Sequence, residues 1–313
     1  MLRLIAQREW LHEAARITLS SKGSHTAGTD GVHKAEIERN LDQYLEEIRH
    51  DLLAGDYKPQ PARRVYIPKP NGKQRPLGIP TLRDRIVQRA MLMAMEPIWE
   101  SDFHRLSYGF RPERSVHHAI RTVQLQLQDG THEAGRWVIE GDLSSYFDTV
   151  HHKKLMRCVR GRIRDQRFTA LLWRFLKAGH IDKGLFRAAE EGVLSPLLSN
   201  IMLNEFDQWM DRHYVGKKAR KDRWYWNRTI TDQRPIALRE GRTWIPAVAY
   251  CRYADDFVLI VKGTKSDAES IRELVRQFLE DELSLTLNMD KTHVTHVNDG
   301  FVFLGHRIIR KRG

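Results

Sequence analysis

Three aspartates follow or separate predicted β-strands, in positions where carboxylates could bind metal ions. Asp255 and Asp256 lie between two apolar runs within residues 247–261, a pattern that predicts a buried β-hairpin with an acidic turn. Asp142 comes after a short apolar run and Gly141, where another strand should end. Partly buried carboxylates are costly unless a cation lies beside them. Mg²⁺ suits such a place because it binds carboxylates together with phosphate oxygens and water.

The ends of neighbouring strands can bring acids that are distant in the sequence to one edge of a sheet. Asp142, Asp255 and Asp256 are therefore a candidate two-metal site. In that chemistry, paired cations activate a 3′ hydroxyl and stabilise the leaving oxygens of an in-line phosphoryl transfer. An Asp-Asp pair alone is expected about once by chance in a chain of this length. The prediction depends instead on the flanking strands and the separate upstream acid.

Composition narrows the class of protein. The 313 residues carry a formal net charge of +12 with a pI near 9.8, which indicates a polyanionic partner. The length allows two subdomains, and no apolar run approaches the roughly 18 residues of a membrane span. The apolar part of the N-terminus is too short for a secretory signal. Cys158 and Cys251 are the only cysteines, so we expect a cytoplasmic protein with neither a disulfide framework nor a zinc site.

Two basic segments are candidates for contact with nucleic acid. Residues 57–83 contain seven basic residues and no acid, and Asn71-Gly72 between prolines predicts an exposed hairpin. Arg63 and Arg64 on its first strand are predicted to bind RNA.

The second basic segment belongs to a polar, irregular insertion over residues 211–246. Lys217, Lys218 and Arg220 precede an aromatic cluster there, and basic residues beside aromatic rings suit backbone binding and base stacking. The alternative is a solvated loop with a small apolar anchor.

Helical periodicity is clear in several segments. We expect amphipathic helices over 37–52, 85–100, 115–127 and 198–210. Residues 151–173 also look helical, and their arginines form either a strand-binding face or a solvated one. Ser266 to Glu269 fits a capping box that opens a further helix. Residues 1–30 are poorly periodic.

The residues around Asp255 resemble a known catalytic motif. Tyr253-Ala-Asp-Asp256 is similar to the catalytic box of reverse transcriptases, and further blocks resemble group II intron reverse transcriptases (maturases) and their bacterial relatives. Seven blocks follow the order of that family: 75–85, 107–112, 136–148, 195–201, 247–261, 287–292 and 301–305. One tetrapeptide is weak evidence, whereas seven collinear blocks are strong evidence.

The resemblance implies an α+β fold, the right-hand polymerase palm and fingers without a thumb. It implies an N-terminal extension (1–30), fingers with the first part of the palm (31–136), the first catalytic palm strand (137–150), a helical region beside the fingers (151–190) and further palm (191–313). The implied activity is RNA-directed DNA polymerisation, adding dNTPs to a DNA primer on an RNA template. Two Mg²⁺ ions, or Mn²⁺ as a substitute, would be the cofactors of this activity. The resemblance also implies binding of intron RNA for splicing or retrohoming. The expected location is the bacterial cytoplasm, in association with RNA or the nucleoid.

The resemblance also assigns roles to single residues. Leu143 joins Asp142, Asp255 and Asp256 in the metal site, and Lys69 and Arg75 would contact the triphosphate.

Three further residues are left with two interpretations each. Phe147 stands at the steric-gate position that selects deoxynucleotides, or is a core aromatic. Lys291 is a nucleotide-side lysine or an exposed cation. Arg111 contacts the template or stabilises its own turn.

One segment departs from the family's pattern. The family has Pro-Gln-Gly-Gly before its Ser-Pro, whereas this chain has Glu190 and Glu191 ahead of Gly192 and Ser195. Either Glu190 replaces the glutamine or a few residues are missing; a carboxylate there would repel a triphosphate. Two other interpretations stay open: a catalytically weakened, maturase-like RNA-binding fragment, or a domesticated reverse transcriptase in phage defence or beside a CRISPR integrase.

Overall fold

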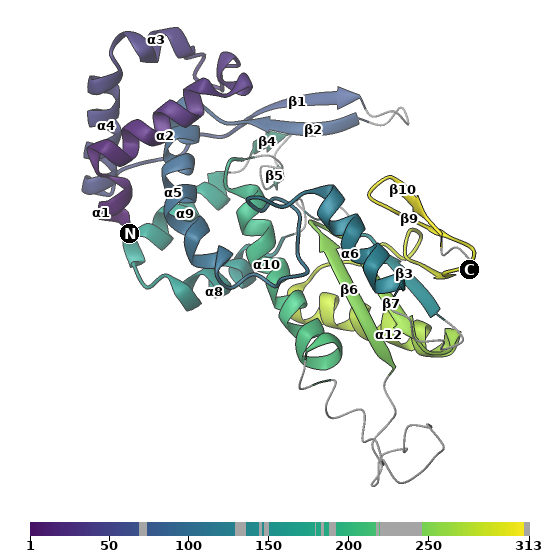
Figure 1. The fold of residues 1–313 in the computed structure, drawn as a ribbon. Helices are drawn as coiled ribbons and strands as arrows, with labels where there is room; N and C mark the ends of the chain where they lie inside the picture. The colour runs from purple at the N-terminus through teal and green to yellow at the C-terminus, as the bar shows by residue number, and fades with distance from the viewer. Residues whose placement is uncertain are drawn as a thin grey trace. The chain divides into compact units, whose positions relative to one another are not determined.

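The computed structural model describes two compact units, each built from two separate parts of the chain. The described residues are 1–68, 74–128, 136–143, 146, 150–178, 180–182, 185–187, 192–216, 219 and 246–309. The first unit comprises Met1–Phe103 and Phe147–Met202, and the second comprises His104–Tyr146 and Leu203–Gly313 (Figure 1). Both helices and strands are present, as the expected α+β class requires.

The first unit is mainly helical. Its helices are α1 (Leu2–Ile5), α2 (Arg8–Ser20), α3 (Lys34–Arg39), α4 (Leu41–Ala54), α5 (Leu82–Glu100), α8 (His152–Arg162) and α9 (Gln166–Ala178). Helix α10 (Ser195–Met210) begins in this unit and ends in the second. Two hairpins complete it: β1 (Arg63–Pro68) with β2 (Gln74–Ile79), and β4 (His180–Asp182) with β5 (Leu185–Arg187).

Helix α5 is central to the first unit, and its beginning is fixed by a buried acid. The Thr81 hydroxyl caps the helix by accepting a hydrogen bond from the Asp84 amide at 3.0 Å. The Asp84 carboxylate accepts hydrogen bonds from the Tyr57 hydroxyl at 2.8 Å and the Gln60 amide at 3.0 Å. Burial raises the pKa of Asp84, while these donors oppose the rise. The polar contacts tie the chain before β1 to the start of α5.

The helices of the first unit differ from the sequence expectations in three places. The expected helix over 37–52 is two helices, because the chain leaves helical geometry at Asn40. Residues 151–173 likewise form α8 and the start of α9, separated near Ile163. Helix α2 was not predicted, because small or polar residues such as Ala14 and Thr18 occupy much of its buried face and weaken the apolar pattern.

The basic hairpin is confirmed. Strands β1 and β2 pair antiparallel, from Arg63 opposite Ile79 to Pro68 opposite Gln74. Tyr66 on β1 is 50% exposed, which agrees with an open hairpin rather than a core one.

The second unit is built on a four-stranded antiparallel sheet. Its order is β6 (Ala247–Tyr253), β7 (Asp256–Lys262), β3 (Arg136–Gly141) and β8 (His293–His296). Helices α6 (Val116–Gln128) and α12 (Lys265–Phe278), and a small hairpin of β9 (Phe301–Phe303) and β10 (His306–Ile308), surround it (Figure 1).

Strand β7 is buried on both faces, which explains its unbroken apolar run. Val258 and Ile260 lie in a cluster with Ala119 and Val123 of α6. The next residue position points the other way, since side chains alternate along a strand. Phe257 accordingly packs edge-on against Phe206 of α10, with ring centroids 5.1 Å apart.

The cap of α12 corrects one expectation. The capping box is formed by Thr264 and Asp267, not by Ser266 and Glu269, and the helix begins at Lys265. The Asp267 carboxylate accepts a hydrogen bond from the Thr264 amide at 2.7 Å. The Thr264 hydroxyl accepts one in return from the Asp267 amide at 3.2 Å. Because β7 ends at Lys262, the helix follows it at once and Ser266 already lies in the first turn.

This cap predicts a difference between two neighbouring substitutions. Thr264→Ala should lower the free energy of unfolding by about 1 kcal/mol, because an amide of the first turn loses its acceptor. Ser266→Ala, at the position predicted from sequence, should change it by less than about 0.5 kcal/mol. Urea unfolding of both variants measures the difference, and an equal or larger loss for Ser266→Ala would contradict this assignment.

Candidate catalytic site

Asp255 and Asp256 occupy the turn between β6 and β7, so the predicted acidic hairpin is confirmed. Tyr253 pairs with Asp256 as the last pair of the ladder, which leaves Ala254 and Asp255 as a two-residue turn. Ala254 has φ = 54° and is buried. A left-handed conformation costs a non-glycine residue roughly 1–2 kcal/mol, so the surroundings must hold this turn in place.

A buried arginine holds the turn. Arg252 is 0% exposed, and its Nη1 donates to the Ala254 carbonyl oxygen at 2.8 Å. Its Nε and Nη2 donate to the two carboxylate oxygens of Asp207 at 2.7 and 2.6 Å. Asp207 also accepts from the Tyr250 hydroxyl at 2.5 Å. The planar guanidinium thus connects α10 to the carbonyl that precedes Asp255.

Sequence reasoning missed Arg252 and Asp207. A usable signal was present in each case, since a cation in an apolar strand and an acid on an apolar helix are each costly to bury alone. Neither signal identifies its partner, because 45 residues separate the two.

The block 107–112 packs against the strand that leads to the acidic turn. Ser107 pairs in parallel with Arg252, and the Tyr108 amide donates to the Arg252 carbonyl oxygen at 2.9 Å. The Ser107 hydroxyl accepts from Arg252 Nη2 at 2.7 Å. A Cβ on Gly109 would lie 2.3 Å from the Ala254 nitrogen, so only glycine allows this approach.

Arg111 has a structural position. It is 7% exposed, and its Nη1 donates to the carbonyl oxygens of His104 and Ser107, each at 2.8 Å. Of the two roles considered for Arg111, this arrangement favours stabilisation of its own turn over contact with the template.

Asp142 leaves the sheet beside Asp256. In the antiparallel pairing of β3 with β7, Gly141 lies opposite Phe257, so the next residues outward are Asp142 and Asp256. A Cβ on Gly141 would lie 2.1 Å from the ring of Phe257, which explains the glycine before the acid. The register therefore places two of the three predicted acids at one edge of the sheet.

The segment 287–292 brings a cation to Asp142. The Asn288 amide donates to the Asp142 carbonyl oxygen at 2.8 Å, and Asn288 Nδ2 donates to Asp142 Oδ2 at 3.2 Å. Lys291 Nζ donates to the same Oδ2 at 2.9 Å and forms an ion pair, although its side chain is 67% exposed. Leu143, the other predicted metal-site residue, is buried and bridges to Leu287.

The three acids and the lysine influence one another electrostatically. Burial, followed by repulsion from Asp255 and Asp142, raises the pKa of Asp256 to about 6. Burial and repulsion from Asp142 also raise the pKa of Asp255. The hydrogen bond to Asp142, with attraction to all three carboxylates, raises the pKa of Lys291. These shifts require that the four groups lie near one another.

The donor chemistry fits a hard divalent cation. Clustered, half-buried carboxylates that resist ionisation are stabilised by a nearby positive charge. Among the residues that the structure describes, no three His, Cys, Asp or Glu side chains are grouped closely enough to hold one metal ion as they stand. Asp142 is instead paired with Lys291. In this arrangement Lys291 contacts one of the two carboxylate oxygens of Asp142, Oδ2.

The remaining predicted site residues are only partly described. Arg63 is exposed on β1, and the guanidinium of Arg64 lies 5.5 Å from the centroid of the Tyr66 ring. Arg75 pairs with Ile67 in the hairpin, but its side chain lies outside the described residues. Five others lie outside the described residues altogether: Lys69, Phe147, Lys217, Lys218 and Arg220. Glu190, in the segment that departs from the family's pattern, lies outside them as well.

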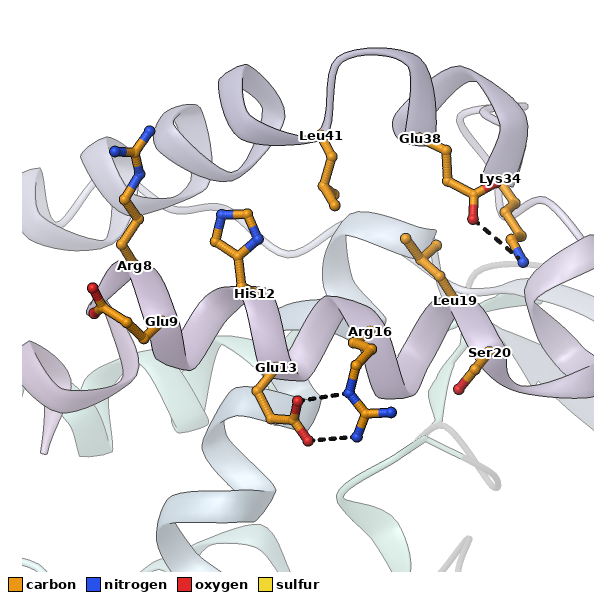
Figure 2. Close-up of a pocket in the computed structure, with 10 residues that line it drawn as sticks. All are labelled: Arg8, Glu9, His12, Glu13, Arg16, Leu19, Ser20, Lys34, Glu38 and Leu41. Atoms are coloured by element: carbon orange, nitrogen blue, oxygen red, sulfur yellow. Dashed lines mark hydrogen bonds and ion pairs between the residues drawn. The ribbon is translucent and has the colours of Figure 1, made fainter.

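A separate groove lies in the first unit, between α2 and the α3–α4 pair (Figure 2). It encloses about 750 Å³ and contains none of the predicted site residues. Arg8, Arg16 and Lys34 are balanced by Glu9, Glu13 and Glu38, and two of these pairs are in direct contact: Arg16 with Glu13, and Lys34 with Glu38. This internal balance provides no excess charge for an ionic ligand.

Comparison with known proteins decides the family. Residues 67–308 match the family described as "Reverse transcriptase (RNA-dependent DNA polymerase)". The chain belongs to this family. It is 70% identical to Protein YkfC of Escherichia coli, over the whole chain and 83% of YkfC. It is 31% identical to the Group II intron-encoded protein LtrA of Lactococcus lactis, again over the whole chain but over only 57% of LtrA. It is also 25% identical to the mitochondrial Nuclear intron maturase 1 of Arabidopsis thaliana, over 74% of this chain and 41% of that protein.

Solved structures agree on the fold. Apo telomerase from Candida tropicalis superposes with a TM-score of 0.54 at 12% identity, over 80% of this chain and 47% of that one. Telomerase from Candida albicans, in complex with a fragment of telomeric RNA, gives a TM-score of 0.51 at 12% identity, over 88% and 48% of the two chains. At such low identity the likeness shows the fold alone. The chain thus has the palm and fingers fold, as predicted. None of its described helices is long and apolar enough to cross a membrane.

The close approach at Gly109 predicts a loss of stability. Gly109→Ala should lower the free energy of unfolding by about 1–3 kcal/mol, because the new Cβ overlaps the turn before Asp255. Gly161→Ala is the matched control, since nothing lies within 4 Å of the added Cβ. It should be neutral or stabilise by up to about 1 kcal/mol, as expected for alanine in a helix. Equal urea-unfolding curves for the two variants would contradict the packing described here.

The raised pKa of Asp256 predicts that replacing its carboxylate by an amide stabilises the protein, and that this gain depends on pH. A carboxyl with a pKa of about 6 when folded and 3.8 otherwise binds its proton more tightly in the folded state. Its ionisation therefore costs stability as the pH rises through about 6. After a discount for partial exposure, Asp256→Asn in EDTA should raise the free energy of unfolding by about 1–2 kcal/mol at pH 8 and by about half as much at pH 5.

Asp299→Asn provides the control for that measurement, because it removes an exposed acid of the same unit. It should change the free energy of unfolding by less than about 0.5 kcal/mol at both pH values. A gain for Asp256→Asn that is absent at pH 8, or equal at both pH values, would show that its carboxylate is not strained by its neighbours.

Proposed function

We propose that this reverse transcriptase is an RNA-directed DNA polymerase that adds dNTPs to the 3′ end of a DNA primer on an RNA template. One observation carries the proposal: the β3–β7 register sets Asp142 beside Asp256, with Asp255 in the adjoining turn. The mutual pKa shifts of Asp255 and Asp256, which include repulsion from Asp142, support the same cluster.

Asp142, Asp255 and Asp256, with Leu143 beside them, would hold two Mg²⁺ ions, for which Mn²⁺ could substitute. Such ions, when bound, activate the attacking hydroxyl and neutralise charge on the transferring and leaving phosphates.

The other residues of the site position these groups. Arg252 fixes the carbonyl before Asp255 and so sets the direction of the acidic turn. Lys291 stays protonated because its pKa is raised, and after release from Asp142 its ammonium is available to an anionic triphosphate. We assign Lys69 and Arg75 to the triphosphate and Phe147 to the exclusion of a 2′-hydroxyl.

A second candidate function is RNA binding in support of intron splicing, with weak or no polymerisation. It is favoured by the maturase among the relatives and by the departure at Glu190 and Glu191, which either puts a carboxylate where the family has glutamine or shortens the segment. The net charge of +12 suits both functions. A domesticated role in phage defence or beside a CRISPR integrase would use the same site.

Primer extension separates these candidates. Asp255→Ala and Asp142→Ala should each lower the rate of dNTP addition on an RNA template by about 10³-fold or more, because a ligand of the metal pair is lost. RNA affinity, measured in parallel by fluorescence anisotropy, should change by less than about threefold. Asp299→Ala, at an exposed acid away from the sheet edge, should match the wild type in both assays.

Extension at the wild-type rate by either aspartate variant would refute the three-acid assignment. A wild-type protein that binds RNA but extends no primer with Mg²⁺ or Mn²⁺ would favour the maturase-like function instead.

A further inference from the structure

Helix α8 of the first unit carries a row of cations that the fold does not use. Lys153, Arg157 and Arg160 are exposed and lie three or four residues apart, so they share one face of the helix. Arg164 is exposed in the linker that follows. We call these four residues the α8 stripe.

The stripe differs from the other cations of its neighbourhood, which have structural partners. Arg162 forms an ion pair with Asp102, Arg167 donates to the Leu53 carbonyl oxygen, and Arg174 donates to the Gly55 carbonyl oxygen at 2.7 Å. The four stripe residues make no hydrogen bond or ion pair with any residue that the structure describes. Their charge is therefore available to a ligand.

No acid offsets the stripe within its own helix or the next. Neither α8 nor α9 contains an aspartate or glutamate. The nearest acid in the described sequence is Asp165, which is bound to the amino group of Met1 at 2.9 Å and to the Leu2 amide at 2.8 Å. Elsewhere, helical cations such as Arg16 and Arg49 each have a glutamate three residues away.

The chemistry of the stripe fits a polyanionic backbone. The Cβ atoms of its three helical members are spaced by about 5–6 Å, as neighbours at three- and four-residue intervals are. A membrane surface would require an apolar face beside the charges. The apolar side of α8, formed by Leu155, Met156 and Val159, is buried in the protein.

We propose that the α8 stripe binds the phosphate backbone of RNA, as a surface additional to the three-acid site. The choice of RNA rests on the proposed function; the preference for a polyanion rests on the stripe itself. Contacts of this kind are independent of base sequence and weaken as salt rises, because bound cations are released from the phosphates.

A salt titration with charge-matched variants tests the proposal. The stripe variant changes Lys153, Arg157, Arg160 and Arg164 to glutamine. The control variant changes four cations that form ion pairs within their own helices: Arg16, Lys34, Arg49 and Lys265. Both variants lose four positive charges, so an effect of net charge alone is the same in each.

The measurement is binding of a fluorescent RNA hairpin to the full chain between 50 and about 300 mM KCl. The stripe variant should bind roughly 10–100-fold more weakly at 100 mM, and its log–log salt slope should fall by about 3. The control variant should stay within about threefold of wild type. A conservative variant, Arg157→Lys with Arg160→Lys and Arg164→Lys, should retain its affinity for RNA, because binding to the phosphate backbone depends mainly on positive charge.

Equal weakening of the stripe and control variants, or no weakening of either, would overturn the proposal. A loss in the conservative variant as large as in the glutamine variant would also overturn it. Thermal unfolding confirms that each variant is folded. Primer extension by the wild type distinguishes failure of this proposal from failure of the proposed function. If the wild type extends no primer but the stripe variant loses RNA binding, only the polymerase function is refuted. If the wild type extends a primer but the stripe variant binds RNA normally, only the proposed binding role of the α8 stripe is refuted.

Discussion

The buried ion pair between Arg252 and Asp207 is the contact on which the acidic turn depends. It lies wholly out of water, where an unpaired charge would cost several kcal/mol, so neither partner can be lost alone. The guanidinium uses its remaining donors on Ser107 and on the carbonyl of Ala254. One side chain thus joins α10, the 107–112 turn and the β6–β7 hairpin, and keeps the strained backbone before Asp255 in place.

Unlike that ion pair, the cluster of acids destabilises the folded protein. Its carboxylates repel one another and are partly buried, so their ionisation weakens the folded protein at neutral pH. Lys291 offsets part of that charge through Asp142. Here, mutually repelling carboxylates are carried by a turn that hydrogen bonds hold in place. This arrangement is expected of a catalytic site, because contacts around the site recover the stability that the site itself loses.

Positive charge in the first unit divides into two kinds. Some arginines are structural, since they donate to carbonyl oxygens at helix ends or pair with acids, as Arg174 and Arg162 do. Others, on the exposed face of α8, have no such partner among the described residues. The net charge of +12 indicates a polyanion but not its location. Burial and hydrogen bonding distinguish the cations that build the fold from those that remain available for binding.

The sequence by itself determined the acidic hairpin, the basic hairpin, most helices and the family, because these depend on local periodicity, turn residues and motif order. Local sequence patterns placed the cap of α12 two residues after its true position. They also missed α2, because its small buried residues give only a weak apolar periodicity. Only the tertiary structure decided that Asp142 lies beside Asp256, that Lys291 pairs with Asp142, and that Arg111 faces its own turn. The first two facts follow from strand register and from contacts between residues more than a hundred positions apart, which no local pattern encodes. Arg111 contacts carbonyl oxygens only four and seven residues away, but its sequence neighbours do not decide between that turn and a template.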